Sequence, residues 1–516
     1  YEMELWLEFR RVLFRSNMWI NDGNERMEKL KELRKKIDNL DKVIMDALDE
    51  RLELAKEVGR IKALNNMQTL DKQREKEILK KSKVYKNNEA IKNIYQEIFT
   101  QSKKLQEFNY FLVGKTLNYS FSPLIYRYLG IENYQLLETL DFESIFKIPF
   151  QGINVTNPYK YQACAKCDIL DETSKLTGVV NTIVRKDGKL VGYNTDYLGF
   201  KETLEHFQVA VNGKKVIIVG NGATAKTIKK VLESKNPNKI ITLARNPKGI
   251  DEYLISDYVK FLDFEIIINA TPYGTYPNLE KEYLFPLTHF SNLTTLIDVI
   301  YNPLKSPLLL SGNESLKKIN GLYMLVSQAT HAASIFLGDN KTLYTNFIYH
   351  DLLLKLTNIV LIGMPYAGKS TLGKKLSERL EKDFVDLDLE MKKNQHDLES
   401  ILMAGKNESD FRFLEMEYAN KFSKNLSQVI ATGGGIVKSR EAIDFLKRNG
   451  IIVYLDENLD VLKSRIDNTR PLIKSSSDLE KLYYERKDLY LKYSDIIIKE
   501  IDLERIVEKI YEYFSN

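Results

Sequence analysis

A strand-like apolar run followed by a glycine-rich turn, IVLIGMPYAGKSTLGKKL, occupies residues 359–376. Backbone N–H groups between Gly363 and Gly368 could surround phosphate oxygens. Lys369 could reach the terminal phosphates, and the hydroxyl of Ser370 could bind Mg²⁺. The sequence therefore predicts an ATP and Mg²⁺ site made by Gly363, Ala367, Gly368, Lys369, Ser370 and Thr371.

Side chains that could hold a phosphate acceptor follow this turn. FVDLDLE is predicted to place Asp386 and Asp388 on one side of a strand end, because side chains alternate along a strand. One carboxylate could organise magnesium-bound water while the other receives a hydroxyl proton. Three arginines and a glycine run come later, at Arg412, Arg470, Arg486 and 433–435. Guanidinium groups bind carboxylates in a bidentate way, so an acceptor carrying its own carboxylate is expected.

A second glycine-rich turn lies in KKVIIVGNGATAKTIKKVL, residues 214–232. Gly220 and Gly222 allow a tight turn and the close approach of a pyrophosphate, and Ala223 stands where the pattern usually has another glycine. The next strand ends in Arg245, where an acidic residue would favour NAD. Arg245 and Lys248 instead favour the 2′-phosphate of NADP. The expected NADP contacts are Gly220, Asn221, Gly222, Ala223, Arg245 and Lys248.

Paired polar residues precede this second turn. Ser120 and Ser122 could bind a carboxylate through their hydroxyls. Lys160 and Asp196 could bridge one substrate hydroxyl and move its proton while hydride leaves the same carbon, without a metal.

Charged and polar residues also share faces in the helical N-terminal region. Arg51 and Lys62 are eleven residues apart, so they lie on one helical face, whereas Arg34 points roughly sideways. Two further groups fall on two later helices: Asp71, Arg74 and Glu75, then Ser102 and Gln106.

The elements that must position these residues differ along the chain. Residues 27–106 have apolar positions at helical spacing, which predicts one helix of about 50 Å and two more near 71–83 and 88–106. A long helix with one apolar stripe needs partners, so an all-α homodimer is expected. Residues 108–357 and 358–516 alternate strand-like and helical patterns, which indicates α/β architecture. Residues 1–26 are interpreted as a non-native or disordered extension.

Composition excludes several classes of function. The 516 residues carry a net charge of only +5, without the basic block that nucleic acid would require, so small anionic substrates are expected. No apolar run is long enough to span a membrane. The two cysteines, Cys164 and Cys167, are expected to be reduced thiols in a cytoplasmic protein.

With GMPYAGKST, DLD, FRFLE, GGG and RPL in order, residues 358–516 resemble shikimate kinase. The resemblance implies that Asp388 is the base, that Asp386 joins Ser370 at Mg²⁺, and that Arg470 closes a lid over the phosphates of ATP. It also implies a shikimate site made by Asp388, Arg412, Gly434 and Arg486. Arg465 is a candidate for stacking on adenine.

Residues 108–357 resemble shikimate dehydrogenase through SFSP, GINVTNPYK, GVVNT, GYNTDYLG, NATPYG, DVIYNP and GLYMLVSQATHAA. The resemblance implies that Lys160 is the acid/base residue and Asp196 its partner. It implies a shikimate site of Ser120, Ser122, Thr156, Lys160, Asn181, Asp196, Tyr301 and Gln328. Tyr119 stands where the family usually has His, so the use of quinate beside shikimate stays open. His331 is expected to pack or to cap.

Residues 27–106 resemble the all-helical chorismate mutase family through LRKKIDNLDKVIMDALDERLELAKEVGRIK and LDKQRE. The resemblance implies that Arg51 binds a substrate carboxylate in its own subunit and Arg34 one in the partner subunit. Lys62 and Gln106 would polarise the ether oxygen, and electrostatic stabilisation would be sufficient for a pericyclic rearrangement. The chorismate site would comprise Arg34, Arg51, Lys62, Asp71, Arg74, Glu75, Ser102 and Gln106.

The resulting interpretation is a trifunctional enzyme of aromatic amino-acid biosynthesis. Its expected parts are a mutase domain (27–107), a dehydrogenase (108–357) and a P-loop kinase (358–516). Within the dehydrogenase, 108–210 and 312–357 would bind substrate and 211–311 would form the Rossmann part. Three alternatives are a helical domain that only senses chorismate or prephenate, a scaffold of inactive enzymes, and a quinate-using catabolic dehydrogenase.

Overall fold

The computed structural model describes residues 2–64, 72–106, 109–117, 119–148, 150–277, 279, 283–396, 401, 407–466, 473 and 475–515, with the backbone only for 2–26, 60, 63, 64 and 72. Asp71 and Arg470 lie outside the described residues. The chain divides into two compact units: Tyr1–Asn109 with Leu140–Phe150, and Tyr110–Thr139 with Gln151–Asn516.

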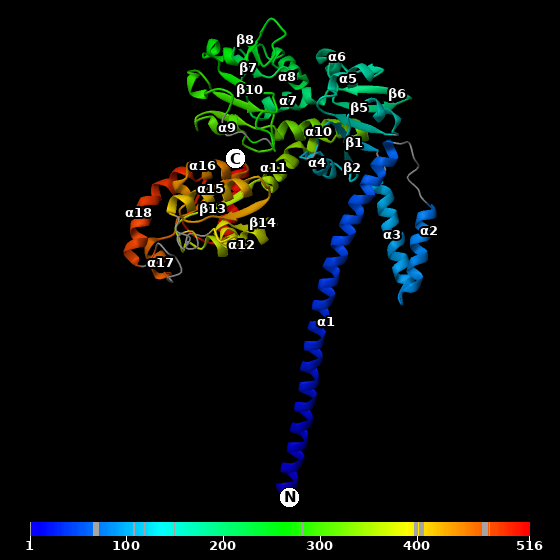
Figure 1. The fold of residues 1–516 in the computed structure, drawn as a ribbon, viewed down its shortest axis with the longest axis vertical. Coiled ribbons are helices and arrows are strands. Elements are labelled where there is room, and N and C mark those ends of the chain that lie inside the picture. The colour runs from blue at the N-terminus through cyan, green and yellow to red at the C-terminus, as the bar shows by residue number, and fades with distance from the viewer. Residues whose placement is uncertain are drawn as a thin grey trace. The chain divides into compact units, whose positions relative to one another are not determined.

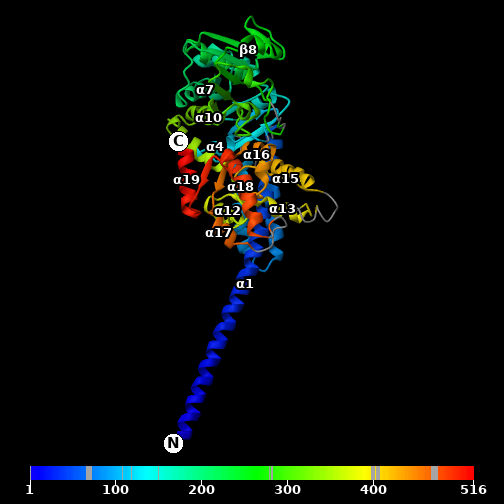
Figure 2. The same ribbon diagram turned by 90° about the vertical axis from the view of Figure 1, so that its left-hand side faces the viewer.

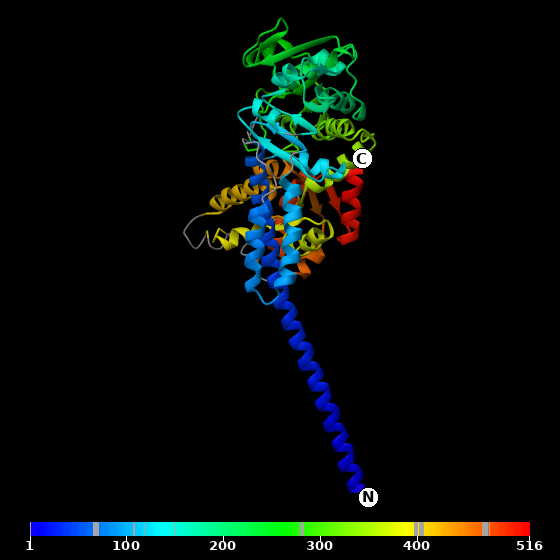
Figure 3. The same cartoon turned by 90° about the vertical axis from the view of Figure 1, so that its right-hand side faces the viewer.

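The first unit is helical, as expected. It contains α1 (Glu2–Leu64), α2 (Lys72–Lys81) and α3 (Asn88–Gln106), with a 3₁₀ turn at Ser82–Val84. Helix α3 packs against α1 (Figures 1 and 3). The two helices approach closely at Gly59, where a Cβ atom would lie 2.6 Å from Cα of Gln106. A larger residue there would force the helices apart.

The apolar stripe predicted on α1 faces solvent in this unit. Leu33, Ile37, Leu40 and Ile44 follow one another at helical spacing, and Leu40 is 61% exposed. Exposed apolar residues continue along the helix at Val58 and Ile61. Contiguous apolar faces of this kind are common at protein–protein interfaces.

The middle segment begins with a mixed sheet of order β2-β1-β3-β5-β6-β4. Strands β1, β2 and β3 are parallel, β5 is antiparallel to both β3 and β6, and β4 is parallel to β6. The strands are β1 (Tyr110–Gly114), β2 (Tyr134–Glu138), β3 (Gly152–Val155), β4 (Ile169–Leu170), β5 (Thr182–Lys186) and β6 (Lys189–Tyr193). Helices α4 (Ser122–Tyr128), α5 (Lys160–Lys166) and α6 (Glu172–Thr177) follow β1, β3 and β4.

A second, wholly parallel sheet follows in the order β12-β11-β10-β7-β8-β9. Its strands are β7 (Lys215–Val219), β8 (Lys239–Ala244), β9 (Glu252–Leu254), β10 (Ile266–Asn269), β11 (Thr295–Asp298) and β12 (Lys317–Ile319). The central strands are buried and rich in Ile and Val, as in a sheet covered on both faces. Strand β12 extends this sheet beyond residue 311, the expected end of the Rossmann part.

Long helices pack beside these two sheets. They are α7 (Thr195–His206), α8 (Ala223–Glu233), α10 (Leu322–Leu337) and α11 (Thr345–Leu356), with a short α9 (Pro307–Ser311). Helices α7 and α10 pack along each other. They are joined by Glu202, which accepts hydrogen bonds from Ser327 and lies 2.7 Å from Nε2 of His331. His331 therefore helps to join α10 to α7.

The C-terminal segment is a parallel five-stranded sheet of order β14-β15-β13-β16-β17. The strands are β13 (Asn358–Ile362), β14 (Asp383–Asp386), β15 (Gln428–Ala431), β16 (Gly450–Leu455) and β17 (Ile496–Ile498). Around them lie α12 (Lys369–Arg379), α13 (Leu387–Lys393), α15 (Glu408–Ser423), α16 (Arg440–Lys447), α17 (Leu459–Ser464), α18 (Ser476–Tyr493) and α19 (Leu503–Ser515), as Figure 2 shows.

One local expectation about this segment is wrong. Asp386 ends β14, but Asp388 lies in the first turn of α13 rather than on the strand. The helix begins early because the Asp386 carboxylate accepts a hydrogen bond from the backbone N–H of Leu389 at 3.1 Å and so caps it. The relative orientation of the Asp386 and Asp388 side chains is therefore not set by the alternation of side chains along a strand.

Among the described residues, none of the helices combines the length and apolar character needed to cross a membrane.

Candidate active sites

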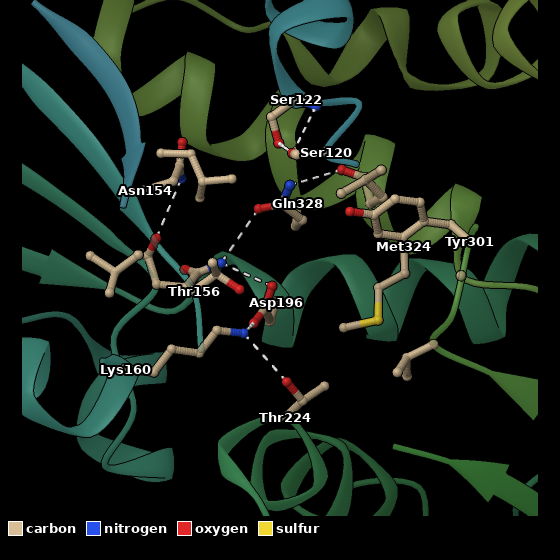
Figure 4. Close-up of a pocket in the computed structure, with 16 residues that line it drawn as sticks. Ser120, Ser122, Asn154, Thr156, Lys160, Asp196, Thr224, Tyr301, Met324 and Gln328 are labelled. Carbon is tan, nitrogen blue, oxygen red and sulfur yellow. Dashed lines mark hydrogen bonds and ion pairs between the residues drawn. The ribbon is translucent and has the colours of Figure 1, made fainter. Parts of the chain in front are cut away.

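A close ion pair lies in the middle segment. Lys160 is the first residue of α5, and Asp196 lies in the first turn of α7. The Lys160 ammonium lies 2.5 Å from Oδ2 of Asp196 and 3.3 Å from Oγ1 of Thr224 (Figure 4). Because the two side chains are only 12% and 10% exposed, water screens their attraction weakly. The pair can hold and transfer a proton beside a reacting carbon.

Buried amides fix the Asp196 carboxylate. Nδ2 of Asn181 donates to Oδ1 of Asp196 at 2.9 Å and to Oγ1 of Thr195 at 3.0 Å. The same nitrogen lies 3.4 Å from Oε1 of Gln328 on α10. These contacts use Oδ1 of Asp196 and leave Oδ2 facing Lys160. The orientation of the carboxylate therefore depends on Asn181, directly before β5, and on Gln328 of α10, which are distant in sequence from Asp196 of α7.

Hydroxyl groups lie across from the Lys160–Asp196 pair (Figure 4). Oγ of Ser120 lies 3.1 Å from Oγ of Ser122, at the start of α4 (Figure 4). Burial raises the pKa of the Tyr301 phenol, although its hydrogen bond with Ser120 opposes that shift. The phenol therefore remains a neutral donor. Three hydroxyls in one place can bind a carboxylate without adding a competing charge.

These residues surround two communicating cavities. One of about 230 Å³ is lined by Ser120, Ser122, Thr156, Asn181, Tyr301 and Gln328. Another of about 760 Å³ is lined by the second glycine-rich turn and the loops that follow β8 and β10. Lys160 and Thr224 line both. The smaller cavity suits a single-ring acid and the larger one a dinucleotide, and both meet at the ion pair.

The second glycine-rich turn fits a pyrophosphate. It joins β7 to the eleven-residue helix α8, and Gly220, Asn221, Gly222 and Ala223 all line the larger cavity. A Cβ atom built on Gly222 would meet no atom within 4 Å. The N-terminal end of α8 therefore faces open space into which an anion can come close to the backbone.

Arg245 and its neighbours line the larger cavity where β8 ends. Arg245 follows β8 and lines the cavity. Asn221 donates at 2.9 Å to Oε2 of Glu252, which also accepts the backbone N–H of Lys248 at 2.8 Å. Burial raises the pKa of Glu252, but these hydrogen bonds outweigh it and lower the pKa overall. Glu252 was missed from sequence, because no motif marks a carboxylate that folds back onto the turn.

The first glycine-rich turn has the conformation of a phosphate-binding loop. It joins β13 to α12, and Gly368 before the helix has a φ of +80° that a side chain would strain. The Lys369 ammonium donates to the carbonyls of Gly363 and Met364 at 2.9 Å each. Ser370 and Thr371 are exposed in the first turn of α12. These residues fit a nucleotide's phosphates, with the Ser370 hydroxyl able to bind Mg²⁺.

The residues expected to hold the phosphate acceptor converge near this loop. Nη1 of Arg486 donates to the carbonyl of Gly434 at 2.9 Å, and Nη1 of Arg412 lies 2.7 Å from Oε2 of Glu415. A Cβ atom on Gly433 would lie 2.7 Å from Oδ1 of Asp388. Burial raises the pKa of Glu415 despite the opposing charge of Arg412. Glu415 was missed from sequence, although it lies within FRFLE.

The helical unit brings part of its expected set together. Nη1 of Arg51 donates to Oγ of Ser102 at 2.7 Å, which links α1 to α3. Glu75 on α2 lies 2.9 Å from Lys103 of α3. Arg34 is exposed on α1, and seventeen residues at 1.5 Å each place it about 25 Å from Arg51. One subunit therefore cannot bring both arginines to a single small substrate.

Cys164 and Cys167 are free thiols, as expected. Burial raises the pKa of Cys164 and, for Cys167, raises it to about 12.

Comparisons with known proteins match three parts of the chain. Family models match for chorismate mutase type II at residues 33–107, the shikimate dehydrogenase substrate binding domain at 112–183, and shikimate kinase at 365–515. Shikimate dehydrogenase (NADP(+)) of Clostridium perfringens (strain SM101 / Type A) is 33% identical over 255 residues, covering 44% of this chain and 91% of that protein. The Methanococcus vannielii counterpart is 33% identical over 260 residues, covering 44% and 90%.

Two solved structures are also similar. Shikimate dehydrogenase 1 from Peptoclostridium difficile is 32% identical, with a TM-score of 0.43, covering 48% of this chain and 98% of that one. A chorismate mutase/shikimate 5-dehydrogenase fusion protein from Clostridium acetobutylicum is 29% identical, with a TM-score of 0.43, covering 48% and 97%.

The glycine turns and the buried lysine–carboxylate pair define the class: a dinucleotide-dependent dehydrogenase joined to a P-loop kinase. The chain belongs to the shikimate dehydrogenase family. It carries a chorismate mutase domain before that enzyme and a shikimate kinase domain after it. The expected trifunctional enzyme of aromatic biosynthesis is thereby confirmed, with NADP(H), ATP and Mg²⁺ as its cofactors.

Proposed function

We propose that Lys160 and Asp196 perform proton transfer during the reduction of 3-dehydroshikimate to shikimate. NADPH supplies the hydride to the carbonyl carbon when it is bound. The Lys160 ammonium donates a proton to the carbonyl oxygen, which becomes the new hydroxyl, and Asp196 holds the ammonium in place. The observation that carries this proposal is the 2.5 Å contact between Lys160 and Asp196 where the two cavities meet.

The rest of the smaller cavity would bind the substrate ring. The hydroxyls of Ser120, Ser122 and Tyr301 receive its carboxylate, because they are neutral donors grouped on one wall. Thr156, Asn181 and Gln328 line the cavity with groups that can bind ring hydroxyls. In the larger cavity, the turn at Gly220–Ala223 holds the pyrophosphate, and Arg245 pairs with the 2′-phosphate.

In the kinase, we infer that Asp388 accepts the proton of the shikimate 3-hydroxyl as its oxygen attacks the γ-phosphorus. Arg412 and Arg486 bind the carboxylate of the ring, with Gly434 contributing backbone contact. Lys369 stabilises charge on the transferring phosphoryl group, and Asp386 and Ser370 hold Mg²⁺. The support is the convergence of Asp388, Arg412 and Arg486 on the glycine run at 433–435.

In the helical unit, we propose that two copies pair through the exposed apolar face of α1 to form chorismate mutase sites. Arg51, Lys62 and Gln106 act within one subunit, and Arg34 comes from the partner. Arg74, Glu75 and Ser102 complete the pocket, as does Asp71 outside the described residues. The exposed stripe Leu33, Ile37, Leu40 and Ile44 and the separation of about 25 Å between the arginines support this pairing.

The domain limits that we propose are 27–107, 108–357 and 358–516, with residues 1–26 outside the functional domains. A cytoplasmic location is part of the proposal, because NADPH and ATP are consumed and both cysteines are free thiols.

One reaction mixture tests the two consecutive steps. The full chain is supplied with 3-dehydroshikimate, NADPH, ATP and Mg²⁺, and the products are identified by mass spectrometry. Shikimate 3-phosphate should form only when both cofactors are present. The variant Lys160→Met should form none from 3-dehydroshikimate yet should phosphorylate added shikimate at the native rate. Phosphate transfer failing in this variant as well would indicate misfolding rather than loss of a catalytic proton.

A chorismate assay tests whether the helical domain is a mutase or only a sensor of chorismate. A mutase should convert chorismate to prephenate, and Lys62→Ala should abolish turnover while chorismate still binds. A native chain that binds chorismate without converting it would favour the sensor.

A further inference from the structure

Two tyrosines from different lobes of the dehydrogenase meet at the rim of the cofactor cavity. Tyr119 belongs to the loop between β1 and α4, and Tyr276 belongs to the loop after β10. Their ring centroids are 4.5 Å apart, and the planes cross at 73°. This edge-to-face arrangement is a favourable geometry for two aromatic rings. Both residues line the larger cavity, and Tyr119 remains 38% exposed, so the pair lies at the mouth rather than in the core.

A second aromatic contact lies beside the first. Phe121 from the same substrate-lobe loop meets Tyr301 of the cofactor lobe, with centroids 5.3 Å apart. The two loops of the cofactor lobe are themselves linked, because the backbone N–H of Tyr276 donates to the carbonyl of Asn302 at 3.1 Å. Opening the cleft would therefore have to separate the Tyr119–Tyr276 pair.

We propose that Tyr119 and Tyr276 form an aromatic clasp that closes the cofactor cavity and slows dissociation of NADP(H). The clasp is a positioning device, since the proton transfer is assigned to Lys160 and Asp196. It works through ring contact, so the phenolic hydroxyls are dispensable. It also gives a role to Tyr119, the residue at which the sequence departs from its family's usual histidine.

The two tyrosines have different neighbours, so substitutions at each position can be compared to test the contact between them. Tyr119 directly precedes Ser120, so replacing it could also disturb the carboxylate site. Tyr276 belongs to the other lobe and lines the larger cavity but not the smaller one. An effect shared by substitutions at both positions therefore reports on their mutual contact.

The test measures NADPH dissociation in the full chain by stopped-flow fluorescence, by displacing bound NADPH with excess NADP⁺. Tyr119→Ala and Tyr276→Ala should each raise the dissociation rate constant by about 2- to 10-fold, the range expected from loss of one aromatic pair. The double alanine variant should be no faster than the faster single variant. Tyr119→Phe and Tyr276→Phe keep the rings and should dissociate at the native rate.

Two controls keep the result interpretable. Shikimate kinase activity in each variant should equal that of the native chain, which shows that the kinase domain of the chain is folded. The KM for shikimate at saturating NADP⁺ should not change in Tyr276→Ala. Native dissociation rates in the alanine variants would overturn the clasp. So would a double variant whose increase in the dissociation rate constant equals the product of the two single increases. Phenylalanine variants as fast as the alanine variants would also overturn it, because they would assign the effect to a hydroxyl contact.

Discussion

The proposed sharing of mutase sites between subunits predicts a pattern of complementation. Arg34→Ala and Arg51→Ala each remove one carboxylate-binding arginine, from opposite sides of every site in a symmetric dimer. Loss of one partner of a desolvated charge pair costs roughly 2–5 kcal/mol, so each variant alone should lose at least about 30-fold in chorismate turnover. Each parent protein should therefore have almost no mutase activity.

Mixing the two variants should restore activity. In a mixed dimer, one site contains both substitutions and the other contains neither. Random exchange of subunits gives mixed dimers as half of the population, so about one quarter of native activity should return. Mixed dimers isolated through two different affinity tags should have about half the native activity per dimer. Turnover is followed by the loss of chorismate absorbance.

The matched control uses two residues that the same subunit contributes to one site. Arg51 and Lys62 of one subunit serve the same site. In a mixed dimer of Arg51→Ala and Lys62→Ala, each site therefore lacks one of the two residues, so neither site is intact and the dimer should stay inactive. Recovery in this control would refute the assignment of Arg51 and Lys62 to one subunit. Absence of recovery from the Arg34 and Arg51 mixture, with mixed dimers shown to form, would refute site sharing itself.

Further predictions concern the other two enzymes. Lys160→Met should lower dehydrogenase kcat by about 10²- to 10⁴-fold, as expected for loss of a general acid, and leave phosphorylation of added shikimate unchanged. Arg245→Asp should raise the KM for NADPH far more than that for NADH, because a carboxylate repels the 2′-phosphate; equal changes would place Arg245 elsewhere. Gly368→Ala should weaken ATP binding, measured by calorimetry, because a φ of +80° disfavours alanine and its methyl group would occupy the open loop. Burial raises the pKa of Asp298 to about 7, so the folded state holds a proton that the unfolded chain releases above about pH 4. The contribution of Asp298 to stability should fall as pH rises from about 4 to 7, and Asp298→Asn should flatten this part of the Tm–pH profile; an unchanged profile would contradict the buried carboxyl argument.

Sequence was most informative where a function depends on consecutive residues. The glycine turns and the helical spacing of Arg51 with its neighbours predicted the elements and their order, because local backbone chemistry determines them. Sequence was least informative about contacts between distant segments. Glu252 folds back onto a turn residue, Asn221, 31 positions earlier, and the Tyr119–Tyr276 contact joins two lobes, so neither has a local pattern. The strand expected to continue through Asp388 ended early because capping by Asp386 outweighed alternation.

The division of the dehydrogenase pocket between two sheets has a consequence for how such enzymes diversify. Most of the residues that we propose to bind the ring come from the first sheet with α7 and α10, with Tyr301 added from the second lobe, whereas Arg245, proposed to bind the 2′-phosphate, follows β8 of the second sheet. A recombination event that exchanged the connection between β8 and β9 would bring in a new dinucleotide preference and leave the residues that read the ring untouched. Substrate range and cofactor preference are therefore separable traits, on which selection can act one at a time.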